Sequence, residues 1–141
     1  MATPSQLQVA RELLGKPWAQ GATGPAAYDC WGMVRHYTLH ALGLVLPSVA
    51  VHAATADELH AAARHSGWHP VSAPPREHDI VLARSLETGG RHVGVVLDLD
   101  GLPHLLHCLG SVTNPLPGVV VERLSEALSR YHSPRTYRHL A

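Results

Sequence analysis

The sequence predicts an α+β domain in which N-terminal helices pack on a mainly antiparallel β-sheet. In the first half of the chain, apolar residues recur at helical spacing in three segments, and each segment follows a capping residue. In the second half, short runs rich in valine and leucine are separated by turn residues, as strands require. Helices followed by strands along the chain are typical of the α+β class.

Three helices are expected in the first half. The candidate capping groups are Thr3 with Gln6, Asp29, and Thr55 with Glu58; the two Thr pairs form capping boxes. Each helical run ends near a glycine, the residue that favours helix C-termini: Gly15, Gly43 and Gly67.

The second half is expected to form the sheet. The strand candidates are the apolar runs 79–83, 92–99, 105–109, 119–121 and 136–139. A turn at Asp100-Gly101 joins the second run to the third. Residues 125–131 are predicted to form a short helix, and the Pro-rich stretch 70–75 to be a connector within the domain.

The composition fits one globular domain over residues 1–141. The chain has 141 residues, of which 45% are hydrophobic and 16% charged. Its 11 basic residues balance 11 acidic ones, which argues against nucleic acid as a partner because such partners are bound by clustered positive charge.

Neither a membrane span nor a secretion signal is visible. No window approaches the roughly 18 apolar residues that a membrane span needs. The first residues lack the basic and apolar regions of a signal peptide. We therefore expect synthesis in the cytoplasm, with any export following another route.

Cys30 is the candidate nucleophile. It follows the capping residue Asp29, so it lies in the first turn of the second helix, after a loop rich in Gly and Pro. The positive end of the helix dipole and the unpaired amides there favour the thiolate, which is the reactive form of cysteine. The alternative is a buried core cysteine, a common role for this residue type.

His92 is the candidate base. It begins a valine-rich strand, from which an imidazole can reach a helix N-terminus packed on the sheet and take the thiol proton. A third polar group that orients this base is expected on the next strand. His107 is the first choice and His104 the alternative; the two face opposite sides of a strand. Cys108 is expected to be a core residue.

Metal binding is not expected. His36 and His40 lie one helical turn apart, as metal ligands can, but on the predicted solvent side of the second helix and without an acidic third ligand nearby. Neither an HExxH nor a CxxC motif occurs. We therefore expect no metal and no cofactor.

The order Tyr28-Asp29-Cys30-x-Gly32, then His92-Val93-Gly94, then a polar residue on the next strand resembles the NlpC family of papain-like cysteine peptidases. The resemblance extends over nearly the whole chain. It implies a papain-like fold and cleavage of bacterial peptidoglycan stem peptides, typically at the bond between D-glutamate and a diamino acid. Cys30, His92 and His107 would then be the catalytic nucleophile, base and orienting residue.

The resemblance also assigns the residues around Cys30. Tyr28 would lie beside the site and help the backbone amide of Cys30 to stabilise the oxyanion. Asp29 would cap the helix and touch the substrate. Many cell-wall members carry serine where this chain has Trp31, which leaves the bond that is cleaved open.

The Asp29-Cys30-Trp31-Gly32 form is similar to the phage tail-assembly branch of that family. The expectation is a peptidoglycan endopeptidase in a phage-like tail or gene-transfer particle, with other tail proteins as partners and action in the periplasm or cell wall. Two alternatives stay open. One is a non-catalytic structural tail component with the same fold, and the other is a secreted amidase toxin of interbacterial competition.

Overall fold

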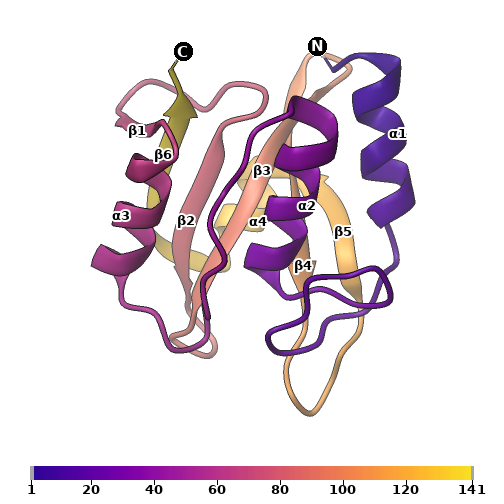
Figure 1. The fold of residues 1–141 in the computed structure, drawn as a ribbon, viewed down its shortest axis with the longest axis vertical. Coiled ribbons are helices and arrows are strands. Elements are labelled where there is room, and N and C mark those ends of the chain that lie inside the picture. Colours follow the sequence, from indigo (N-terminus) through magenta and orange to yellow (C-terminus); the bar gives the residue numbers. More distant parts are fainter. Residues whose placement is uncertain (1, 141) are drawn as a thin grey trace.

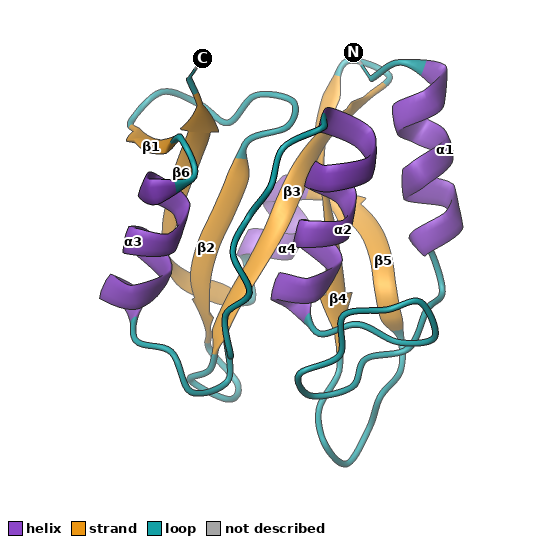
Figure 2. Cartoon of the chain, in the orientation of Figure 1, coloured by secondary structure: helices purple, strands orange, loops and turns teal. Residues whose placement is uncertain are grey.

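Six strands form one sheet in the order β1-β6-β2-β3-β4-β5 (Figures 1 and 2). The computed structural model describes residues 2–140. Every neighbouring pair of strands is antiparallel. The strands are β1 (Trp68–Val71), β2 (Ile80–Ser85), β3 (Arg91–Leu99), β4 (Leu102–Leu109), β5 (Gly118–Arg123) and β6 (Tyr131–His139).

Helices cover both faces of this sheet. The helices are α1 (Pro4–Leu13), α2 (Cys30–Leu42), α3 (Ala56–His65) and α4 (Leu124–Leu128). In Figure 1 the first three lie in front of the sheet and the short α4 lies behind it. The predicted α+β class, with N-terminal helices on an antiparallel sheet, is therefore confirmed. No helix of residues 2–140 has the length and apolar character needed to cross a membrane.

The predicted helix caps are present. In α1, the Thr3 side chain accepts a hydrogen bond from the Gln6 amide, and the Gln6 side chain accepts one from the Thr3 amide. Thr55 and Glu58 form the same capping box at the start of α3. Helix α2 ends at Gly43, whose φ of 69° is the left-handed conformation that glycine adopts without strain.

Side chains alternate along β3 and β4 and divide the interior into two cores. Val95 and Leu106 belong to the larger core, together with buried residues of α1, α2 and α3. Val96 and Leu105, their sequence neighbours, pack with α4 on the other face. Because side chains alternate between the two faces of a strand, this division determines the face on which each remaining side chain of β3 and β4 lies.

One strand was missed from the sequence. Trp68–Val71 forms β1 and pairs with β6, whereas Pro70 had indicated a connector. Proline cannot donate a ladder hydrogen bond, but β1 is the edge strand of the sheet, where this loss is tolerated. Trp68 is fully buried and holds this edge on the core.

Two other strands begin several residues earlier than predicted. The turn at Asp100-Gly101 consists of two residues with φ of 54° and 78°, so β4 starts directly at Leu102. Strand β6 starts at Tyr131 instead of residue 136. The second difference matters for function, because it brings Tyr131 into the site described next.

Candidate active site

Cys30 is the first residue of α2, and the cap that precedes it is well formed. The Asp29 side chain accepts a hydrogen bond from the Gly32 amide at 2.6 Å. The thiol of Cys30 lies against the backbone amides of Cys30, Trp31 and Val93, the last of which follows His92 on β3. The start of the helix therefore directs N–H groups at the sulfur, as the sequence predicted.

Burial and the helix start act in opposite directions on the charge state of Cys30. Burial and then the neighbouring Asp29 carboxylate raise the pKa of the Cys30 thiol to about 12, and the backbone amides only partly oppose this. Desolvation of the thiolate thus opposes the influence of the helix start, which favours the thiolate. A thiol with so high a pKa must lose its proton to a base during the reaction.

His92 and His107 lie side by side on adjacent strands. His92 Nε2 and His107 Nδ1 are 2.8 Å apart, so the predicted hydrogen bond between the two rings is present. Burial, followed by the charges of His107 and Arg130, lowers the pKa of His92 well below its usual value. A neutral imidazole is the form that accepts a proton, as a general base must.

His104 does not take part in this contact. Its Nδ1 lies 2.9 Å from the Leu102 carbonyl oxygen, and the residue is half-buried near the turn that starts β4. His107, by contrast, is fully buried. Of the two histidines proposed to orient His92, the geometry selects His107, while its catalytic role stays a prediction.

The hydrogen bonds continue beyond His107 to a carboxylate on β5. His107 Nε2 lies 2.7 Å from Glu122 Oε1. In the sheet, His107 is opposite Gly94 on β3 and Val120 on β5. His92 and Glu122 are each two residues from those positions, so all three side chains share one face and form a diagonal across three strands.

Two further residues support the histidines from the segment that follows β5. Arg130 donates hydrogen bonds to both carboxylate oxygens of Glu122. The Tyr131 ring stacks on the His92 ring. Sequence reasoning missed Glu122, Arg130 and Tyr131. The available signal was a carboxylate at the end of the valine run 119–121, beside the strand that carries His107.

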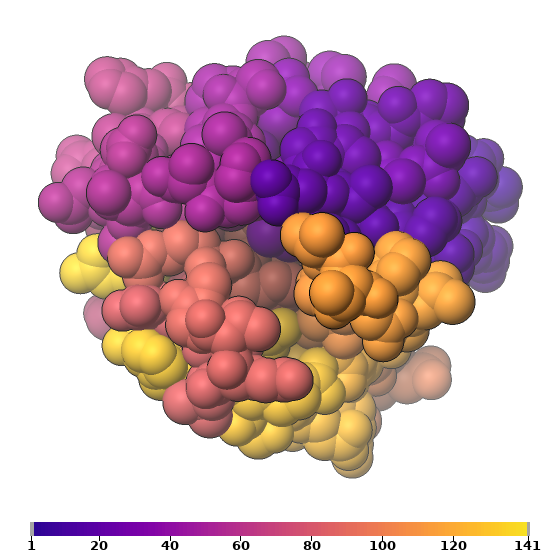
Figure 3. All heavy atoms as spheres, turned by 90° about the horizontal axis from the view of Figure 1, so that it is seen from below, coloured from indigo at the N-terminus to yellow at the C-terminus, as the bar shows by residue number. Residues whose placement is uncertain are grey.

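A large cleft opens over these residues. Its volume is about 1060 Å³, and its lining includes Cys30, His92 and Tyr131, with Trp18 and Arg91 on its walls. Figure 3 shows this face of the molecule hollowed between the salmon-coloured region around the β2–β3 turn and the orange region of the β4–β5 loop. The candidate nucleophile and base therefore line one solvent-accessible groove.

The other residues singled out near Cys30 have packing positions. Trp31 is 1% exposed and its indole N–H donates to the Pro47 carbonyl oxygen at 2.8 Å. The Tyr28 hydroxyl lies 3.4 Å from His36 Nδ1. Within residues 2–140, the cleft lining includes neither side chain. All three residues are buried, with Asp29 as the helix cap, and the predicted contacts of Tyr28, Asp29 and Trp31 with substrate or oxyanion stay predictions.

Cys108 is a core residue, as predicted. It is 1% exposed, belongs to the larger core, and its thiol donates to the Tyr28 carbonyl oxygen at 3.3 Å. Burial, followed by Cys30 and Asp29, raises the pKa of Cys108 to about 12. This thiol holds the loop before α2 against β4.

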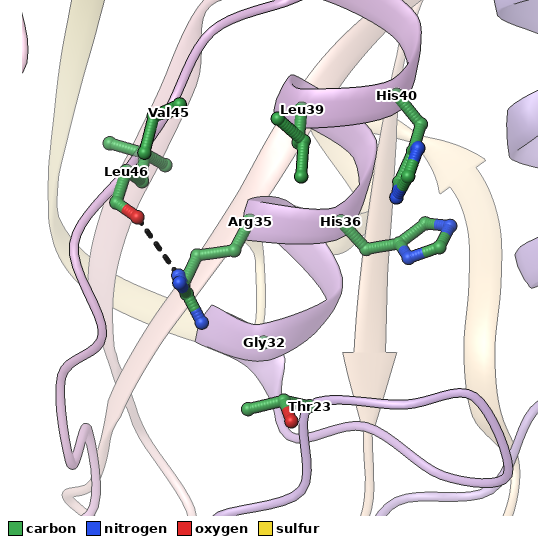
Figure 4. Close-up of a pocket in the computed structure, with 8 residues that line it drawn as sticks. All are labelled: Thr23, Gly32, Arg35, His36, Leu39, His40, Val45 and Leu46. Atoms are coloured by element: carbon green, nitrogen blue, oxygen red, sulfur yellow. Dashed lines mark hydrogen bonds between the residues drawn. The ribbon is translucent and has the colours of Figure 1, made fainter.

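A second, smaller pocket of about 160 Å³ lies on the outer side of α2 (Figure 4). It is lined by His36 and His40, whose ring centroids are 4.3 Å apart, and by Arg35, which donates to the Leu46 carbonyl oxygen. Among the described residues 2–140, no group of three or more His, Cys, Asp or Glu side chains could hold a metal ion.

Known proteins resemble this chain in sequence pattern and in fold. The sequence model of the NlpC/P60 family matches residues 15–133. No curated protein matches the chain.

Three solved structures share the fold. A lipoprotein-like NLP/P60-family protein from Staphylococcus aureus has a TM-score of 0.61 and 19% identity, over 97% of this chain and 41% of that one. The NlpC/p60 domain of the peptidoglycan hydrolase SagA has a TM-score of 0.61 and 18% identity, over 96% and 97%. An N-acetylmuramoyl-L-alanine amidase from Bacteroides uniformis has a TM-score of 0.55 and 14% identity, over 96% and 99%.

Proposed function

The chain belongs to the NlpC/P60 family and has its papain-like cysteine peptidase fold, and on that premise we propose that it hydrolyses amide bonds in the peptide stems of bacterial peptidoglycan. One observation carries this proposal. A cysteine at a helix start and a neutral histidine, itself hydrogen-bonded to a second histidine, line the same cleft. That is the arrangement of cysteine–histidine nucleophilic catalysis.

The reaction follows from the protonation states. His92 removes the proton of the Cys30 thiol while the sulfur attacks the substrate carbonyl carbon. The backbone N–H of Cys30, at the helix start, stabilises the resulting oxyanion. The C–N bond then breaks, and protonated His92 gives its proton to the leaving amine. His92 next activates a water molecule that hydrolyses the thioester, which releases the acid and restores the thiol.

Among the amide bonds of the stem peptide, the bond that we propose is cleaved is the one between D-glutamate and the diamino acid. Stem peptides carry carboxylates, and Arg91 on the cleft wall, next to His92, supplies positive charge for them. A second candidate is the amide between muramic acid and L-alanine. The fold shared with the Bacteroides uniformis amidase supports that candidate.

The biological context that we propose is a phage-like tail or gene-transfer particle, with other tail proteins as partners. The Asp29-Cys30-Trp31-Gly32 form, in which a buried tryptophan stands after the nucleophile, supports it. The protein would be made in the cytoplasm and act in the periplasm or cell wall after delivery by the particle. Mass spectrometry of purified particles tests this, because a tail component is enriched in them.

The experiment for the activity is digestion of purified peptidoglycan, with products identified by mass spectrometry. The wild-type chain is expected to release new amino and carboxyl ends at one stem-peptide bond, and the masses identify that bond. Cys30→Ala is expected to abolish release while keeping the fold, because it removes the nucleophile at a cost of only about 1 kcal/mol of stability. Equal product from wild type and Cys30→Ala would contradict the mechanism. A folded wild type that releases nothing would favour the structural alternative.

A further inference from the structure

The hydrogen-bonded row that starts at His92 ends in an ion pair. His107 has no exposed surface, and its Nε2 faces Glu122 Oε1 at 2.7 Å. The Glu122 side chain is 21% exposed and is held by Arg130, whose Nη1 donates to Oε2 at 3.0 Å and whose Nη2 donates to Oε1. The hydrogen bond to Arg130 is the largest influence lowering the pKa of Glu122, so this carboxyl is ionised.

The ionised carboxylate dictates where each imidazole proton sits. A carboxylate only accepts hydrogen bonds, so His107 must carry a proton on Nε2. In neutral His107 the other nitrogen, Nδ1, then carries no proton and must accept. His92 therefore donates from its Nε2, and the lone pair of His92 remains on Nδ1.

We propose that Glu122 is a positioning residue of the catalytic site: it fixes the tautomer of His107 and, through it, that of His92, so that His92 Nδ1 is the atom that accepts the Cys30 proton. The proposal rests on the proposed function, because it assigns a role in the same reaction. Glu122 is then a fourth member of the site, after Cys30, His92 and His107.

Arg130 has a distinct role in this arrangement. If His107 became an imidazolium, both of its nitrogens would donate, and His92 would have to accept on Nε2 and lose its basic Nδ1. The charged or titratable groups that face His107 are His92 on β3, Glu122 on β5, Arg130 before β6 and Tyr131 on β6. Burial is the main influence that lowers the pKa of His107, and the Arg130 cation adds to it by offsetting the Glu122 charge.

The direct test is ¹⁵N NMR of the histidine side chains at neutral pH, which reports the protonated nitrogen of each ring. In the wild type, His92 and His107 are both expected as Nε2–H tautomers. In Glu122→Leu, His107 is expected to lose that preference and to give a mixture of tautomers. Glu126→Leu, at an exposed glutamate of α4, is the matched control and should leave both tautomers unchanged. A wild-type His107 protonated on Nδ1 alone would overturn the proposal.

Kinetics give the second test. Glu122→Leu is expected to lower kcat/KM by about 10- to 100-fold with little change in KM. Glu122→Gln is expected to recover most of this loss, because its amide oxygen accepts from His107 Nε2. A Glu122→Leu enzyme with wild-type kcat/KM and wild-type tautomers would refute the proposal.

The pH profiles separate this role from a purely structural one. Burial lowers the pKa of His107; against this background Glu122 raises the pKa and Arg130 lowers it further. Since activity requires neutral His107, the acid limb of kcat/KM should move to lower pH in Glu122→Gln and to higher pH in Arg130→Met. These opposite shifts test the positioning role of Glu122 even if Glu122→Leu does not fold. Equal shifts in both variants would contradict that role. The NMR experiment needs no substrate. It therefore still tests the proposal if the substrate has been assigned wrongly.

Discussion

The Tyr131 ring lies flat on the His92 ring, with centroids 4.7 Å apart and an angle of 9° between the planes. Tyr131 starts β6 and also meets His107 edge-on, at a centroid distance of 6.4 Å. It covers one side of the base histidine and contributes to the burial that lowers the pKa of His92. The residue is thus placed to hold the imidazole plane as well as its charge state.

Replacement of Tyr131 by Phe should preserve the site, whereas replacement by Ala should damage it. Loss of a stacked ring costs about 0.5–1.5 kcal/mol, which predicts a fall in kcat/KM of up to about tenfold for Tyr131→Ala. Less burial also raises the pKa of His92 towards its ordinary value, so the acid limb of the pH profile should move to higher pH. If Tyr131→Phe is as impaired as Tyr131→Ala, the hydroxyl and not the stacked ring is the important group.

The high pKa of Cys30 predicts how alkylation depends on pH. With a pKa of about 12, the thiolate fraction should rise about tenfold per pH unit between pH 7 and 10, and so should the rate of reaction with iodoacetamide. Cys108→Ser removes the second thiol from the measurement. It should keep activity within a few-fold, because a serine hydroxyl can also donate to the Tyr28 carbonyl oxygen. A rate that is constant from pH 5 to 8 would instead indicate a preformed thiolate–imidazolium pair.

The two histidines of β4 should differ sharply in their effect on catalysis. His107→Ala removes the partner of His92 Nε2 and is expected to lower kcat/KM by about 10- to 1000-fold, or roughly 1.4–4 kcal/mol. His104→Ala is the control, since the His104 ring bonds the local backbone near the turn, and it should stay close to wild type. Similar losses in both variants would mean that His107 acts through the stability of β4.

Gly94 makes room for the side chains of Leu105 and His107. A Cβ at this position would lie 2.7 Å from Leu105 Cδ1 and 3.1 Å from the Cβ of His107. Gly94→Ala should therefore displace both side chains, with a loss of about 1–3 kcal/mol in stability and a larger relative loss of activity. Thermal unfolding and kcat/KM measured on one preparation check this. Wild-type activity in Gly94→Ala would show that the strands separate without disturbing the His92–His107 contact.

Much of the fold follows from local signals. Capping boxes at Thr3 and Thr55, and the cap at Asp29, are decided by neighbouring residues, so the helix starts are predictable. Strand β1 was not, because Pro70 is acceptable only at a sheet edge, and sheet order depends on long-range pairing.

The site residues also differ in whether local sequence signals predict them. Cys30 and His92 stand at recognisable places, a helix start and a strand start, and alternation distinguishes His107 from His104. The partners Glu122, Arg130 and Tyr131 come from β5 and β6, whose register with the histidine strands no local pattern specifies. The pKa of Cys30 could also not be predicted from the sequence, since it depends on how completely the folded chain excludes water from the thiol.

The two-residue turn at Asp100-Gly101 limits how this protein can evolve. A single inserted residue there would shift β4 by one position against β3, turn His107 to the opposite face and bring an apolar neighbour towards His92. The loop over residues 110–117, between β4 and β5, borders the cleft and can absorb added length without moving either histidine. Insertions and deletions among relatives of this chain should therefore accumulate in that loop, where they reshape the groove, and be rare at the turn.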